Sequence, residues 1–175
     1  MRTVLICHES EEFNRKLVAR WLASFSNLTG IVLLRETRGQ KLRRIRRQLR
    51  WVGLARFLDV LAFRIYYVLF RSAADLEWER TTIDRLSARF PPVSAATPVL
   101  ITSSPNTPEA VAFIRSSAPD IMIARCKALL KEEVFTIPSK GTFVLHPGIC
   151  PEYRNAHGCF WALTNHDLKL VGMTL

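Results

Sequence analysis

The sequence lacks the features that mark secreted or disulfide-stabilised proteins. Its four cysteines, Cys7, Cys126, Cys150 and Cys159, form no CxxC pair and have none of the dense spacing of a disulfide framework. The N-terminus has no positively charged segment followed by a short apolar run and a small-residue cleavage site, so no secretory signal is expected. These absences predict a reduced, cytoplasmic protein.

Glycine is missing where a nucleotide pyrophosphate would need it. The first expected strand, residues 3–7, leads into Cys-His-Glu-Ser-Glu-Glu, which contains three carboxylates and no glycine. A pyrophosphate loop needs glycines so that backbone N–H groups can approach the phosphates. The turn therefore argues against a dinucleotide or P-loop site, and His8 is interpreted as a residue of the rim rather than a catalyst.

Apolar residues are plentiful and follow an alternating plan. Hydrophobic residues make up 49% of the 175 positions, enough for one packed domain over residues 1–175. Strands are expected at residues 3–7, 31–35, 97–104 and 121–124 and in a run that ends at His146; helices are expected at about 10–25, 75–89, 129–135 and 155–165 and from Pro108. Strands that alternate with helices predict an α/β, Rossmann-like fold with a mainly parallel sheet and helices on both faces.

The first helix is expected to follow a simple amphipathic pattern. Ser10 is a plausible N-cap for a helix that ends near Phe25. The residues expected on its apolar side are Phe13, Leu17, Trp21 and Leu22.

Positive charge is concentrated in one segment. The chain has a net charge of +10, and residues 35–71 hold eleven Lys and Arg against only Glu36 and Asp59. Residues 38–50 place seven Lys and Arg among apolar residues at helical spacing, and residues 51–70 are almost wholly apolar. The segment at about 36–75 is therefore predicted to be a basic helical insertion in an otherwise nearly neutral domain.

The apolar part of this insertion has several interpretations. The charges of Arg56, Asp59 and Arg64 fall on one narrow stripe of a helix, within roughly 140° of one another. A membrane span is disfavoured, because each central charge costs about 2.5–3.5 kcal/mol on insertion. A buried or dimer-forming helix pair is favoured. The competing interpretation is that residues 35–71 bind RNA or an acidic membrane surface.

A histidine follows the strand expected at residues 142–145. His146 precedes Pro147 and Gly148, and a second turn at Pro151 makes the loop rigid. In open α/β sheets, ligands bind at the carboxyl ends of strands, so His146 is a candidate site residue. The same stretch contains four side chains that can bind metals, His146, Cys150, His157 and Cys159. Their H-x3-C-x6-H-x-C spacing differs from the tight C-x2–4-C pairs of structural zinc sites, so no metal is expected.

The run from residue 119 to 175 resembles the N-terminal catalytic domain of the folate-dependent formyltransferases, such as methionyl-tRNA formyltransferase and the glycinamide ribonucleotide and sugar-amine enzymes. The pieces that carry the resemblance are, in order, Pro119-Asp120-Ile121, residues 129–134, Ile137-Pro138, Gly141, HPGICPEYRN at 146–155, Trp161-Ala162-Leu163 and Val171-Gly172-Met173-Thr174. Their order and spacing match the family pattern over about the last third of the chain.

The resemblance implies transfer of a formyl group from 10-formyl-tetrahydrofolate to an amine acceptor, either a small molecule or a macromolecule. It implies that His146 is the catalytic residue, which stabilises the oxyanion of the tetrahedral centre and helps to move protons. The residues implied in cofactor binding are Arg125, Cys126, Lys127, Ala128 and Leu129. Those implied in substrate binding are Pro147, Gly148, Tyr153, Arg154 and Asn155.

The chain departs from the family pattern at three points. Val144 occupies the position of the family's Asn, and the loss of such a donor costs about 3–4 kcal/mol of transition-state stabilisation. The family's Asp partner is expected beyond residue 175, so the domain is expected to be incomplete at its C-terminus and the chain alone to have little activity. The basic insertion has no counterpart in the common members.

These departures leave other functions open. One is a catalytically inactive binding module whose basic amphipathic surface docks on RNA, on an acidic lipid surface or on a second copy as a homodimer. Another is a formyl-tetrahydrofolate hydrolase, in which water replaces the amine. Asn155 or His157, at the start of the next expected helix, could also replace the missing amide.

Overall fold

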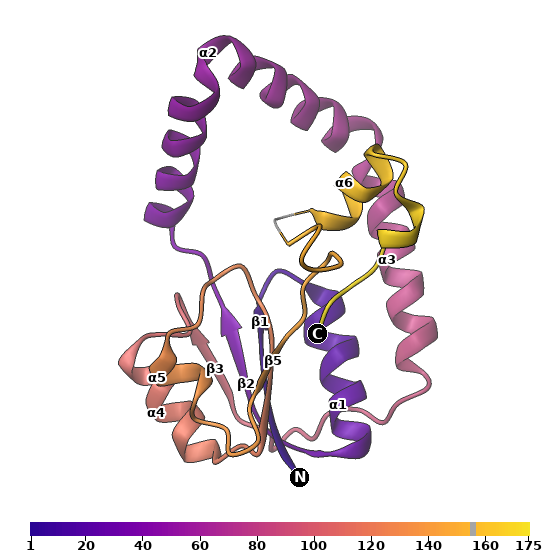
Figure 1. Cartoon of the computed structure of the whole chain (residues 1–175). Helices are drawn as coiled ribbons and strands as arrows, with labels where there is room; N and C mark the ends of the chain where they lie inside the picture. The colour runs from indigo at the N-terminus through magenta and orange to yellow at the C-terminus, as the bar shows by residue number, and fades with distance from the viewer. Residues whose placement is uncertain (155–156) are drawn as a thin grey trace.

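The computed structural model describes residues 1–154 and 157–175 (Figure 1). Five strands form one sheet: β1 Arg2–His8, β2 Asn27–Leu34, β3 Val99–Thr102, β4 Ile121–Arg125 and β5 Thr142–Val144. Their order is β3-β2-β1-β4-β5, and all four neighbouring pairs are parallel. The predicted α/β, Rossmann-like fold with a parallel sheet is confirmed.

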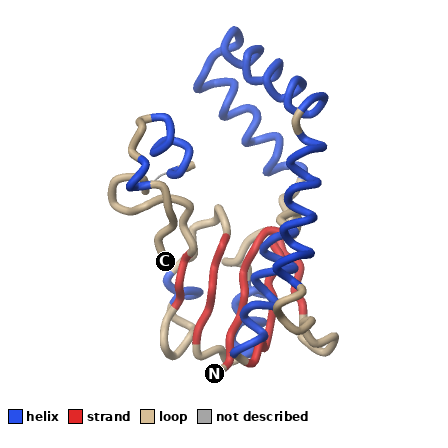
Figure 2. Tube along the Cα trace, turned by 90° about the vertical axis from the view of Figure 1, so that its right-hand side faces the viewer, coloured by secondary structure: helices blue, strands red, loops and turns tan. Residues whose placement is uncertain are grey.

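Helices cover both faces of the sheet (Figure 2). The helices are the π-helix η1 Phe13–Val18, α1 Ala19–Phe25, α2 Arg38–Phe70, α3 Ser72–Ser87, α4 Pro108–Ser117, α5 Glu132–Phe135, α6 Gly158–Thr164 and the short 3-10 helix η2 Leu168–Leu170. On one face α4 and α5 pack against the sheet, and on the other η1 and α1 do so.

The central strands read as continuous apolar runs because both of their faces are buried. In β1, Val4 and Ile6 point into the core beneath α4 and α5, whereas Leu5 and Cys7 point toward η1 and α1. All four side chains are fully buried. This alternation places β1 at the centre of the sheet and of the core.

The first helix differs from its expected form. Ser10 lies in the turn after β1 and does not cap the helix, which forms η1 from Phe13. Phe13 is half-buried and Leu17 and Leu22 are buried, but Trp21 is 42% exposed and packs edge-on against Phe25. The π-turns of η1 have more residues per turn than an α-helix, so they rotate the face that follows them and turn Trp21 outward.

The strands and the later helices also differ from expectation at their ends. β2 begins at Asn27 rather than Ile31, because Asn27 and Leu28 already pair with β1. Gly30 therefore lies inside the strand, where an added Cβ would approach the Ser117 hydroxyl at 2.9 Å. α6 begins at Gly158, three residues after its expected start, and Asn155 lies outside the described residues.

The basic insertion is helical, as predicted. Thr37 and Gln40 form a capping box at the start of α2, and Gly53 interrupts it with a φ of 77° and a ψ of 165°, a conformation that favours glycine. The two halves of α2 rise from β2 and return to α3 as an arch above the carboxyl edge of the sheet (Figure 1). Of the two expected arrangements of its apolar half, burial within the chain is not found, because every residue from 61 to 70 is exposed, and a dimer-forming helix pair stays a prediction. Within the described part of the chain, no helix is long and apolar enough to cross a membrane.

The strand expected to end at His146 is shorter. β5 ends at Val144, and His146 instead forms an isolated antiparallel bridge with Thr174. The His146 N–H donates to the Thr174 carbonyl at 2.9 Å, and the Thr174 N–H donates to the His146 carbonyl at 3.0 Å. The last residues of the chain therefore return to the loop that carries the candidate histidine.

Candidate functional site

The site forms where the strand order reverses. β1 and β4 are neighbours in the sheet although more than one hundred residues separate them in the chain, and such a switch point opens a crevice at the carboxyl ends of the strands. His8 ends β1, and its Nε2 accepts a hydrogen bond from the Lys127 backbone N–H at 3.1 Å. His8 thus lies at the carboxyl edge of the sheet and links the loops that follow β1 and β4.

The loop expected to bind a cofactor, residues 125–129, is fixed at its middle and at its far end. His8 fixes Lys127 in the middle, and the Asn106 amide fixes the far end by donating to the Leu129 carbonyl at 2.8 Å and accepting from the Lys131 N–H at 2.9 Å. The Leu129 side chain is nevertheless 90% exposed. The loop therefore presents a rigid backbone beside an uncovered apolar side chain, an arrangement that fits a flat, partly apolar ligand.

Two further contacts hold this loop, one to η1 and one within the loop itself. The Arg125 guanidinium carbon lies 6.0 Å from the centroid of the Phe13 ring, within the range of a cation–π contact. The Cys126 thiol donates to the Ala128 carbonyl at 3.4 Å, and burial raises the pKa of that thiol. Cys126 therefore remains a neutral structural donor and not a nucleophile.

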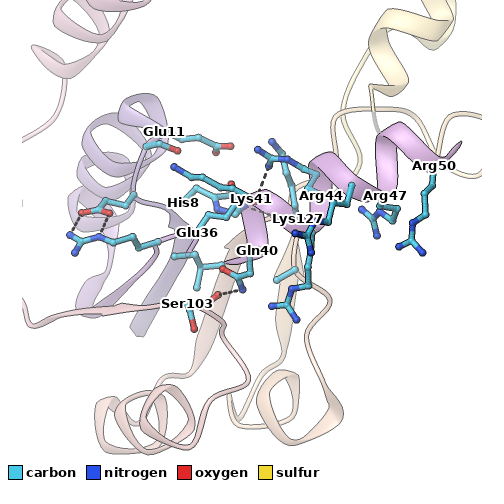
Figure 3. Close-up of a pocket in the computed structure, with 17 residues that line it drawn as sticks. His8, Glu11, Glu36, Gln40, Lys41, Arg44, Arg47, Arg50, Ser103 and Lys127 are labelled. Carbon is cyan, nitrogen blue, oxygen red and sulfur yellow. Dashed lines mark hydrogen bonds and ion pairs between the residues drawn. The ribbon is translucent and has the colours of Figure 1, made fainter. Parts of the chain in front are cut away.

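A cleft of about 1100 Å³ lies between this edge and the first half of α2 (Figure 3). Its lining includes His8, Lys127 and Ala128, together with Lys and Arg side chains of α2 such as Lys41, Arg44, Arg47 and Arg50. Sequence reasoning recognised the basic segment but not that it covers the switch point. Only the capping box at Thr37 and Gln40 marks the start of this helix in the sequence.

The carboxylates of the first turn are partly neutralised in this cleft. Arg35 donates two hydrogen bonds to Glu9, at 2.5 and 2.6 Å, and these bonds lower the pKa of the Glu9 carboxyl. Lys16 lies 2.9 Å from Glu12 in an ion pair of the same turn. The three carboxylates of the first turn therefore carry less uncompensated negative charge than their number in the sequence suggests.

The imidazole of His146 is half-buried in its loop. Its Nε2 lies 3.1 Å from the Tyr153 carbonyl oxygen. A carbonyl can only accept, so Nε2 carries the proton and Nδ1 is the acceptor of the neutral ring. His146 is thus held in one tautomer by the backbone of its own loop.

Close backbone approaches hold this loop together. A Cβ on Gly148 would lie 2.3 Å from the Tyr153 carbonyl oxygen, and one on Gly158 would lie 2.6 Å from the Gly148 Cα. The Thr174 hydroxyl donates to the Gly148 carbonyl at 2.8 Å and accepts from the Cys150 N–H at 2.9 Å. Sequence reasoning did not give Thr174 this role, and only its place in the matched Val-Gly-Met-Thr run could have suggested it.

The remaining residues expected to bind substrate differ in their contacts and in their exposure. The Tyr153 hydroxyl donates to Asp167 at 3.0 Å and accepts from the Asn165 amide at 3.3 Å. Neither Asp167 nor Asn165 was singled out, because no motif marks them. Pro147 and Arg154 are exposed, and Asn155 lies outside the described residues.

The structure brings the two candidate loops to the same place. Ala124 pairs with Val144, and the Leu145 N–H donates to the Ala124 carbonyl at 2.9 Å, so the 125–129 loop and the His146 loop leave the sheet side by side. The Val144 side chain, 47% exposed, offers no polar group there. Among the residues that the structure describes, no three His, Cys, Asp or Glu side chains gather to hold a metal, and the Cys159 thiol donates to the Gly172 carbonyl at 3.0 Å.

Comparison with known proteins supports the family resemblance. No family model matches the chain. Several curated methionyl-tRNA formyltransferases match part of the chain. The protein from Acetivibrio thermocellus is 38% identical over 77 residues, which cover 43% of this chain and 24% of the relative. That of Thermotoga sp. (strain RQ2) is 40% identical over 79 residues, 45% of this chain and 25% of the relative. That of Geobacter sulfurreducens is 36% identical over 90 residues, 48% of this chain and 28% of the relative.

The matched residues span about a quarter of the length of these relatives. The resemblance to formyltransferases inferred from the sequence is confirmed, and it covers 43–48% of the chain, more than the last third that was expected.

Proposed function

We propose that this chain binds a formyl-tetrahydrofolate donor and transfers its formyl group to an amine acceptor. The observation that carries the proposal is the adjacency of the rigid 125–129 loop and the His146 loop at the carboxyl edge of a parallel sheet. The similarity to methionyl-tRNA formyltransferases supports it. The exposed Leu129 and the fixed backbone around Lys127 would hold the donor, and His146 would face its formyl group.

The reaction forms a bond from the amine nitrogen to the formyl carbon and breaks the bond from that carbon to the donor nitrogen. One proton moves from the amine to the leaving nitrogen. A hydrogen-bond donor aimed at the developing oxyanion contributes roughly 10² to 10³ in rate. In the described loop, Nε2–H of His146 is already bonded to Tyr153. Donation to the oxyanion therefore requires a protonated ring, through Nδ1, or release of the Tyr153 carbonyl.

Val144 favours a second candidate function. An isopropyl group cannot donate to an oxyanion, so the same fold can bind the donor without catalysing transfer. In that case the chain is a binding module, and the exposed insertion is its docking surface. A formyl hydrolase would use the same donor site with water as the acceptor.

Calorimetric titration with 5-formyl-tetrahydrofolate, a stable analogue of the donor, tests the proposal. The wild-type chain should bind saturably. Asn106→Ala removes both hydrogen bonds that fix the far end of the 125–129 loop, at roughly 1 kcal/mol each, so it should weaken binding by about tenfold or more.

Ser94→Ala is the matched control, because Ser94 organises a turn before β3 through the Ala96 N–H, outside the cleft lining. It should leave the affinity unchanged. Absence of binding by a wild-type chain with a native circular dichroism spectrum would refute the donor site. Binding without turnover, followed by turnover in Val144→Asn, would assign the inactivity to Val144.

A further inference from the structure

The second half of α2, described for residues 56–70, has an apolar surface that the described chain leaves largely uncovered. Every residue from 61 to 70 is exposed, and Arg64 is the only charged residue among those ten. Leu69 is 68% exposed and Phe70 is 70% exposed. A helix that is apolar on nearly all sides is normally buried in protein or in a membrane. This helix therefore needs a partner surface.

The apolar side of this half-helix is continuous. Leu58, Leu61, Ile65 and Leu69 follow one another at spacings of three and four residues, so they share one face, and all four are exposed. The three charged residues of this half, Arg56, Asp59 and Arg64, project on the opposite side. A helix with this division can lie flat at a boundary between an apolar and an aqueous phase.

The first half of α2 supplies positive charge directly beside this face. Seven Lys and Arg lie within residues 38–50. Of the seven, Arg44 has an ion-pair partner, Glu36, and the others have none among the described residues. Trp51 is 89% exposed at the bend next to Gly53. The second half stands clear of the sheet as part of an arch, so it is open to a large surface, whereas the cations of the first half also line the cleft above the switch point (Figures 1 and 2).

We propose that α2 docks the protein onto an anionic lipid surface, with residues 56–70 lying in the interface and the cations of residues 38–50 at the headgroups. Each basic residue near such a surface strengthens binding roughly fivefold. Trp51, Tyr66 and Tyr67 belong to the residue types that favour the boundary between lipid and water. This docking goes beyond the proposed formyl transfer and does not depend on it.

Charge and polarity distinguish this partner from the two alternatives. A second copy of the chain would bring another segment of net charge +9, residues 35–71, against the first. RNA would use the cations but would leave the face of Leu58, Leu61, Ile65 and Leu69 in water. An anionic lipid surface complements both halves at once.

Vesicle flotation of the full chain tests the proposal. The protein should float with vesicles of phosphatidylcholine that contain about one-third phosphatidylglycerol, and much less with phosphatidylcholine alone. High salt should weaken the binding, because it screens the cations. A folded wild-type chain that does not float with anionic vesicles would overturn the proposal.

Two sets of substitutions separate the two contributions. Leu61→Gln/Ile65→Gln/Leu69→Gln changes only exposed side chains, so the fold should be kept, and partitioning should fall by about a hundredfold or more. Arg43→Gln/Arg46→Gln/Arg47→Gln/Arg50→Gln should lower it by up to about a thousandfold on anionic vesicles.

Matched controls carry the same chemistry elsewhere on the surface. Phe25→Gln/Leu168→Gln removes exposed apolar side chains, and Arg85→Gln/Arg89→Gln/Lys140→Gln/Lys169→Gln removes four exposed charges. Both should float like the wild type, and a control that fails as strongly as its partner would overturn the proposal. A dimer that depends on Leu61, Ile65 and Leu69, or RNA binding without flotation, would overturn it as well.

The result can be read separately from the proposed formyl transfer. The Leu61, Ile65 and Leu69 substitutions lie outside the cleft lining, so they should leave the affinity for 5-formyl-tetrahydrofolate unchanged. Folate binding without flotation would overturn the lipid proposal alone. Flotation without folate binding would overturn the donor site alone.

Discussion

Replacing Thr174 by valine should release the His146 loop while changing almost nothing else. The Thr174 hydroxyl is bonded to the Gly148 carbonyl at 2.8 Å and to the Cys150 N–H at 2.9 Å, and valine has nearly the same shape without either bond. Gly148 is buried, so its carbonyl loses its partner at a cost of about 1–3 kcal/mol. Cys150 is exposed, so its N–H can bond to water instead and costs about 0.5 kcal/mol.

A total of about 2 kcal/mol should lower the melting temperature of a chain of this size by roughly 4–8 °C. Thermal unfolding followed by circular dichroism measures this change, and amide hydrogen exchange of residues 146–154 should become faster. Thr164→Val is the matched control, because the Thr164 hydroxyl donates only to the Phe160 carbonyl of its own exposed helix. Thr174→Ser keeps the hydroxyl and should restore stability. If Thr174→Val and Thr164→Val melt within about 1 °C of each other, the assigned role of Thr174 is wrong.

Two further predictions test the loop geometry and the acid response. Gly148→Ala should lower the free energy of unfolding in urea by about 3 kcal/mol, because the new Cβ would lie 2.3 Å from the Tyr153 carbonyl oxygen. Gly39→Ala is the control: its Cβ would meet open space, so the change should be neutral or slightly stabilising. The Arg2 N–H donates to the Asp120 carboxylate at 2.6 Å, and this hydrogen bond lowers the pKa of the Asp120 carboxyl. The bond therefore contributes fully to stability above the carboxyl's pKa in the unfolded chain, about 3.9, and the contribution is lost as the pH falls through the lower pKa of the folded chain. The melting temperature of Asp120→Asn should therefore fall less between about pH 5 and pH 3 than that of the wild type, and equal slopes would contradict the assignment.

The His146 loop shows how far motif spacing can lead. The sequence placed His146, Gly148 and Tyr153 in one rigid loop at the end of a strand, and the structure does bring them together. It could not show that the imidazole bonds to the Tyr153 carbonyl, because that contact depends on how the chain turns between residues 147 and 153. Thr174 closes the loop from 26 residues away, at a distance where no local pattern operates.

The expectations that failed concern surfaces rather than elements. Trp21 was placed on the buried side of its helix by counting at an α-helical period, and the π-helix before it changed that period. The apolar run of residues 51–70 was expected to form a buried or dimer-forming helix pair, but a helix can be covered only by what packs on it, and the described chain supplies no such cover for residues 61–70.

The sequence by itself determined the layers of this protein. Runs such as residues 4–7 and 31–34 are apolar at every position, and such runs form strands only where helices cover both faces, so the parallel sheet follows from composition and order. The tertiary structure alone decided which loops meet. His8 contacts Lys127 across 119 positions because strand order is set by long-range packing, and the basic half of α2 closes over the switch point. Hydrophobic periodicity is a local property, whereas a site is formed by residues that only the completed fold brings together.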